Sequence, residues 1–130
     1  MNAFDDIGVD QSSFAMRDLI GKDVWQAFTV SLTITSVGAV TATGRYRRVG
    51  ASIEFQVSFS AATSIATTAG TSYLSAPVTM KGLAGIATMQ NATTNVAVGN
   101  CVLAVATSRI YLPAQAASGN TFLVCGSFEA

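Results

Sequence analysis

Two segments in the first half of the chain alternate strictly between apolar and polar residues. They are residues 28–35 and residues 52–59. A period of two places successive side chains on opposite faces of an extended strand. Each segment therefore predicts a β-strand with one face in a core. The apolar positions are Phe28, Val30, Leu32 and Ile34 in the first segment, and Ile53, Phe55, Val57 and Phe59 in the second.

Shorter extended segments follow, separated by residues that favour turns. Glycine pairs with a neighbour at Val37-Gly38, Val49-Gly50 and Ala69-Gly70, among others. Small polar residues fill 60–70 and 89–94, which predicts loops there. Many short strands at this spacing predict an all-β domain over residues 24–130, an antiparallel sandwich or a jelly-roll-like barrel. The additional strands are expected at 39–43, 44–49, 73–78, 95–99, 101–106, 109–112 and 121–128.

Residues 1–23 differ from the rest in charge and period, and we interpret them as an N-terminal arm. They hold five of the seven acidic residues. Ser12 or Ser13 is suited to cap a short helix that ends near Gly21, while a disordered terminus remains an equal alternative. The apolar side chains of the arm are candidates for docking on a partner. They are Phe4, Phe14, Met16, Leu19 and Ile20.

Charge is scarce, and this narrows the possible partners. Only 11% of the residues are charged and the formal net charge is zero. A surface so weakly charged is better buried between subunits, so we expect a homo-oligomer, in particular a trimer. The small basic excess after residue 23 is insufficient for a surface that binds nucleic acid.

The uncharged run 55–79 contains Ser, Thr and Pro77, which argues against a membrane span. The first ten residues lack a secretory signal pattern, so we expect assembly in the cytoplasm.

The residue types that most enzymes use are missing. There is no His, and outside the arm the carboxylates are Glu54 and Glu129. A rigidly held acid–base pair, a nucleophilic triad and a transition-metal site are therefore not expected, nor is a cofactor. Cys101 and Cys125 lie in apolar runs and are expected as buried thiols, with a disulfide formed after cell lysis left open.

The densest cationic feature surrounds Tyr46. In a strand, Arg45 and Arg47 project from one face, and Tyr46 and Arg48 from the other. One interpretation is a clamp for a carboxylate across a subunit interface, a task that suits the bidentate guanidinium group. The other is a strand edge that its charges protect from aggregation.

Four segments, taken in order, resemble small β-sandwich modules of tailed-bacteriophage tail fibres and other virion proteins. They are GRYRRVGASIEFQVSFS (44–60), TSYLSAPV (71–78), SRIYLPAQAASGNTF (108–122) and VCGSFEA (124–130). The resemblance implies a trimeric, non-catalytic β-sandwich that decorates a virion or contacts a host surface. It covers about residues 25–130.

The arm replaces the shaft or coiled coil expected of a tail fibre. We therefore expect a capsid decoration or cement protein, or a head-fibre component, that is assembled in the host cytoplasm and binds other virion proteins such as the major capsid protein. The alternative is a tail-fibre-type module that recognises a host glycan or protein. One Trp and three Tyr, all within or beside predicted strands, leave few aromatic rings free to stack on sugar.

Overall fold

The computed structural model describes residues 24–82 and 85–130, in which strands are by far the commonest secondary structure. A single turn of 3₁₀ helix, η1 (Val105–Thr107), interrupts them. The strands are β1 (Gln26–Phe28), β2 (Leu32–Thr33), β3 (Thr35–Val37), β4 (Val40–Val49), β5 (Ser52–Ala61), β6 (Ser64–Thr67), β7 (Tyr73–Ser75), β8 (Gly85–Asn91), β9 (Val96–Ala104), β10 (Arg109–Tyr111), β11 (Gln115–Ser118) and β12 (Phe122–Glu129).

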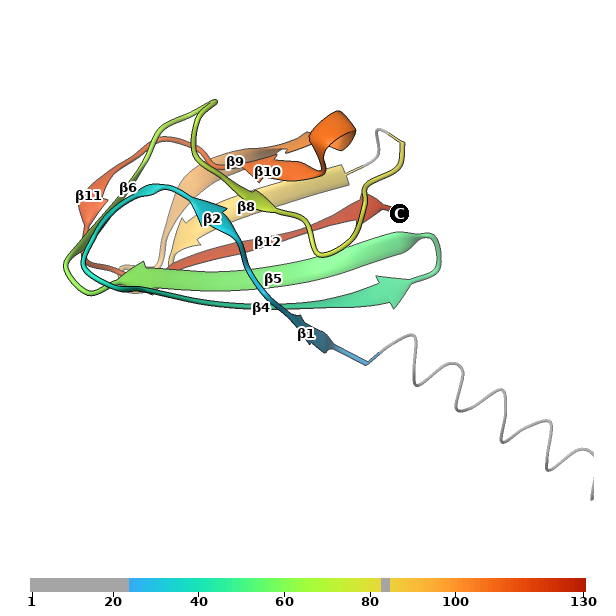
Figure 1. Cartoon of the computed structure of the whole chain (residues 1–130), viewed down its shortest axis with the longest axis horizontal. Coiled ribbons are helices and arrows are strands. Elements are labelled where there is room, and N and C mark those ends of the chain that lie inside the picture. The colour runs from blue at the N-terminus through green and yellow to red at the C-terminus, as the bar shows by residue number, and fades with distance from the viewer. Residues whose placement is uncertain (1–23, 83–84) are drawn as a thin grey trace, which may run out of the picture.

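The strands form two antiparallel sheets. The larger has nine strands in the order β1-β4-β5-β12-β8-β9-β10-β7-β2, and the smaller has three in the order β11-β6-β3. In Figure 1 the long strands β4, β5 and β12 run side by side, and β2, β6 and β10 lie above them. The large sheet thus curls back over itself as a half-barrel. The expected all-β, antiparallel sandwich or barrel is confirmed.

The core lies inside this curl and is built mainly on β5 and β12. Ile53, Phe55, Val57 and Phe59 of β5 are all buried, as the alternation predicted. The Phe59 ring stacks on that of Phe122 in β12, with centroids 5.8 Å apart. Leu74, Ile110 and Ile65 complete the core from β7, β10 and β6. Burial of an apolar side chain of this size contributes about 1.5–3 kcal/mol, so the four buried side chains of β5 are a major source of the apolar burial that stabilises the fold.

The first predicted strand, residues 28–35, is wrong as a single element. The segment divides into β1, β2 and β3, which pair with three different strands, β4, β7 and β6 respectively. Its apolar side chains nevertheless pack against the core, and the intervening polar ones are exposed. Alternation specifies which side of a segment faces inward, but it carries no information on the hydrogen-bonding partner.

The two predicted loops are also wrong in part. Residues 60–70 contain the end of β5 and the whole of β6, whose Ile65 is fully buried. Residues 89–94 begin with the end of β8, where Met89 is buried. These segments are rich in small Ala, Ser and Thr residues, so the few larger apolar residues do not form a recognisable strand pattern in the sequence. Elsewhere the predicted pairs 39–43 with 44–49 and 95–99 with 101–106 merge into the single long strands β4 and β9.

Candidate partner-binding surface

Arg45 and Arg47 lie on the outer face of the large sheet because of their register in β4. Arg45 is opposite Gln56 and Arg47 is opposite Glu54 on β5. Tyr46, between them, points inward and packs edge-on against the Phe28 ring, with centroids 5.9 Å apart. The predicted division of these side chains between two faces is therefore confirmed.

Trp25 lies against both arginines. Its ring is 4.7 Å from the guanidinium carbon of Arg45 and 4.8 Å from that of Arg47. Such cation–π contacts contribute about 0.5–1 kcal/mol at exposed sites. We call Trp25, Arg45, Arg47, Glu54 and Gln56 the cationic platform. Sequence reasoning placed Trp25 at a strand start and missed this role. The pairing of Gln26 with Tyr46 is what brings the preceding residue beside Arg47.

The two arginines differ in their partners. Arg47 Nε donates to Glu54 Oε1 at 2.7 Å in a half-exposed salt bridge. Arg45 donates from Nε and Nη2 to the amide oxygen of Gln56, at 2.9 Å and 2.6 Å. Among residues 24–82 and 85–130, no carboxylate lies within salt-bridge distance of Arg45. The Nε and Nη2 donors of Arg45 thus bind a neutral acceptor, the Gln56 amide oxygen, which the carboxylate of a partner could replace.

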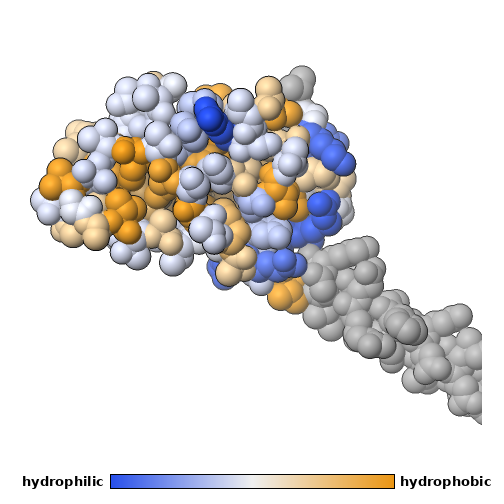
Figure 2. Space-filling view, in the orientation of Figure 1, coloured by the Kyte–Doolittle hydropathy of each residue, from blue (hydrophilic) through white to orange (hydrophobic). Residues whose placement is uncertain are grey.

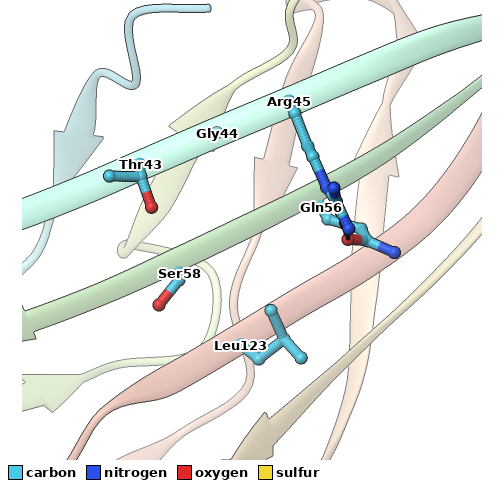
Figure 3. A pocket seen from close by; sticks show the side chains of 6 residues that line it. All are labelled: Thr43, Gly44, Arg45, Gln56, Ser58 and Leu123. Atoms are coloured by element: carbon cyan, nitrogen blue, oxygen red, sulfur yellow. Dashed lines mark hydrogen bonds between the residues drawn. The ribbon is translucent and has the colours of Figure 1, made fainter. Parts of the chain in front are cut away.

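The platform is flanked by open hollows and not by a deep pocket. Figure 3 shows one of them, where Arg45 and Gln56 reach toward each other, Thr43 and Ser58 stand on the same two strands, and Leu123 lies on β12. Its volume is about 160 Å³. A second hollow, of about 300 Å³, lies beside Trp25, Arg47 and Glu54. Such a surface suits contact with another protein better than enclosure of a small substrate.

The arm candidates, Phe4, Phe14, Met16, Leu19 and Ile20, lie outside the described residues. Their proposed docking role stays a prediction, as does the boundary of the arm at residue 23.

A second cluster, which sequence reasoning missed, lies on the outer face of β7 and β10. The rings of Tyr73 and Tyr111 are 5.3 Å apart, and the Arg109 guanidinium lies 4.1 Å from the centre of the Tyr73 ring. Arg109 also donates to the Tyr111 hydroxyl at 3.4 Å. This hydrogen bond is the main cause that raises the pKa of Arg109 above its ordinary value. Their positions in predicted strands suggest that these rings are not free to contact a sugar. Because Leu74 and Ile110 face the core, their neighbours Tyr73 and Tyr111 face outward and are half-exposed.

Both cysteines are unpaired and half-buried. Cys101 is opposite Ala87 and Cys125 is opposite Thr88, so the two thiols lie on opposite faces of the sheet. Burial raises the pKa of the Cys101 thiol to about 12. Burial also raises the pKa of Cys125, and the nearby positive charge of Arg45 partly offsets this.

In the part of the chain that the structure describes, no three His, Cys, Asp or Glu residues gather as a metal site would require. Within the same residues, no helix has the length and apolar character to cross a membrane.

Comparison with known proteins gives no match for the chain among family models, curated proteins or solved structures. The resemblance to virion β-sandwich modules therefore stays a prediction.

Proposed function

We propose that this chain is a non-enzymatic structural protein of a bacteriophage virion, a capsid decoration or cement protein or a head-fibre component. It self-associates, as a trimer, and binds other virion subunits such as the major capsid protein. The proposal rests on the nature of the surface and on the resemblance of four ordered segments to virion modules.

The observation that carries the proposal is an exposed apolar surface with very little charge. Figure 2 shows one face of the molecule, where hydrophobic side chains lie among weakly polar ones and few strongly hydrophilic side chains are present. Ile86 and Val102 are each 65% exposed. They project outward from the neighbouring strands β8 and β9, and the pairing of Ala87 with Cys101 places them opposite each other. After residue 23 the chain has five basic and two acidic residues in all. Apolar side chains that are exposed side by side on a nearly neutral sheet favour burial against another copy.

The cationic platform supports a second type of contact. Trp25 packs against both guanidinium groups, which fixes their positions before a partner arrives. Arginine and tryptophan are also the residues most enriched at binding hot spots. We propose that a carboxylate of a neighbouring virion subunit binds Arg45 and that the apolar residues of the arm provide further attachment.

The measurement that tests self-association is molar mass by light scattering at micromolar concentration. The native chain is expected to be a trimer, and Ile86→Lys is expected to shift it toward monomer, because a charge in an apolar contact must be desolvated. Thr79→Lys, which adds the same charge at another exposed position, should leave the mass unchanged. A native chain that stays monomeric at these concentrations contradicts the proposal.

The alternative role, a tail-fibre-type module that recognises a host glycan or protein, gains support from the outward Tyr73 and Tyr111. Electron microscopy of intact particles separates the two roles, since a cement protein lies on the capsid and a receptor-binding module at the end of a fibre.

A further inference from the structure

A cleft lies beside the outward tyrosines, between the turn at residues 68–72 and the outer face of β9 and β10. Its volume is about 400 Å³, larger than either hollow beside the cationic platform, and it is open to solvent. Tyr111, Val102 and Pro113 supply apolar walls, Asn100 supplies an amide, and Gly70 lies at the turn. A volume of this size matches that of ordinary small-molecule sites.

Partly buried hydrogen bonds hold the walls of the cleft in place. The Thr67 hydroxyl donates to the Pro113 carbonyl at 2.6 Å, and the Leu112 amide donates to the Ser72 carbonyl at 2.9 Å. The Ser72 hydroxyl accepts from the Thr68 amide at 2.9 Å. Thr67 and Ser72 are each only 4% exposed. A cleft whose walls are fixed in this way loses little conformational entropy when a ligand binds.

A bulge in β9 also shapes the cleft. Met89 pairs with Gly99 and Gln90 with Ala97, so Val98 is an extra residue in β9. Bulges redirect the side chains that follow them, here Asn100, and are common beside functional sites. A Cβ atom on Gly99 would lie 3.2 Å from Pro113, so glycine allows β9 to approach the cleft wall closely.

Arg109 brings a positive charge next to Tyr111, one of the residues that line the cleft. It donates to the hydroxyl of Tyr111 and lies over the ring of Tyr73. No carboxylate of residues 24–82 or 85–130 lies within salt-bridge distance of it. The guanidinium is thus oriented by two aromatic side chains while its charge has no carboxylate partner among these residues.

We propose that this cleft binds a sugar residue that bears a carboxylate, such as a uronic acid within an oligosaccharide. The ring of Tyr111, with Val102 and Pro113, contacts the C–H face of the sugar. The Asn100 amide and the Tyr111 hydroxyl bind its hydroxyl groups, and Arg109 binds its carboxylate. A purely apolar ligand would leave the amide and the guanidinium unused, and a simple anion would leave the apolar walls empty. This activity goes beyond the structural role and makes the glycan-recognition alternative more specific. It competes with the proposed contact between copies for Val102, which belongs to both surfaces.

The test is binding of the full chain to an array of bacterial surface oligosaccharides that includes acidic sugars and their neutral counterparts. The best acidic ligand is then titrated by calorimetry against the native protein and variants. Tyr111→Ala is expected to abolish detectable binding, and Arg109→Gln to weaken the acidic ligand at least tenfold while it leaves a neutral counterpart unchanged. Lys81→Gln, which removes an equal charge from an exposed site elsewhere, should have no effect.

Four outcomes overturn the proposal. They are the absence of any acidic ligand on the array, equal affinity of Arg109→Gln and the native protein for the acidic ligand, binding that persists in Tyr111→Ala, and a changed oligomeric state in Tyr111→Ala. The last would identify the cleft as a contact between copies of the chain. Thermal unfolding of each variant shows whether it is folded. If Tyr111→Ala is not folded, Tyr111→Phe, which keeps the ring, is tested in its place.

Discussion

At the scale of single residues, the burial of Cys101 makes the free energy of unfolding depend on pH. Burial raises its thiol pKa from the ordinary 9.0 to about 12. Below pH 9 the thiol is protonated in both the folded and the unfolded chain, so the stability it contributes is fully present. Between pH 9 and pH 12 the unfolded chain ionises first, and the free energy of unfolding falls.

We predict that this fall is smaller in Cys101→Ala than in the native protein. The difference in the free energy of unfolding between the native protein and Cys101→Ala should change by less than about 1.4 kcal/mol per pH unit above pH 9. The thiol is only half-buried, so solvent screens part of the effect. Urea unfolding at several pH values between 8 and 10.5, in reductant, measures it. A difference that does not vary with pH would refute the coupling.

Sequence reasoning placed some side chains of the candidate surface correctly and missed others, for reasons visible in individual residues. Alternation along one strand predicted that Arg45 and Arg47 share a face, because that is a local property. Trp25 reaches them through the pairing of β1 with β4, across about twenty positions of chain. Tyr73 and Tyr111 likewise meet through the pairing of β7 with β10. Contacts of this kind depend on register, which the residue pattern of a single segment does not contain.

At the scale of elements, the segment that carries β1, β2 and β3 crosses from one part of the sandwich to another over Gly44 of β4. A Cβ atom at Gly44 would lie 2.6 Å from the Phe28 ring and 2.6 Å from the Val30 side chain. The absence of a side chain there allows the crossing segment to pack close to β4.

Gly44→Ala is therefore expected to destabilise the fold by about 1–3 kcal/mol, the usual cost of overpacking. Thr43→Ala, on the outer face of the same strand, serves as the control and should cost distinctly less. The shift in the midpoint of chemical unfolding, at constant slope, reports both values. Equal stability of the two variants would mean that residues 28–30 do not pack over Gly44.

Element by element, the sequence was most informative where a strand has a fully buried face. The alternation in β5 was confirmed over its whole length. Strands β6 and β11, rich in Ala, Ser and Thr, could not be distinguished from loops by composition. The positions of these strands follow from the strands they pair with, and pairing is a property of the whole fold.

At the scale of the molecule, we predict that deletion of residues 1–23 leaves the sandwich folded, because the buried side chains of residues 24–82 and 85–130 pack into a core cluster with one another. Circular dichroism and thermal unfolding should match those of the native chain. Binding to phage particles should fall sharply, since each apolar anchor from the arm is worth about 1.5–3 kcal/mol when buried. If the truncated protein binds particles with unchanged affinity, attachment belongs to the sandwich, and the cationic platform becomes the better candidate.

The strand nearest the C-terminus occupies the middle of the large sheet. β12 pairs over eight residues with β5 on one side and over seven with β8 on the other. During translation, β4 and β5 can pair as a hairpin early, and β8 and β9 can do so later, but the two hairpins have no common strand until β12 has been synthesised. A ribosome that stops before Phe122 therefore releases two hairpins with exposed apolar faces, a species that proteases and chaperones recognise readily. The topology thus ties the solubility of the nascent chain to the completion of its synthesis.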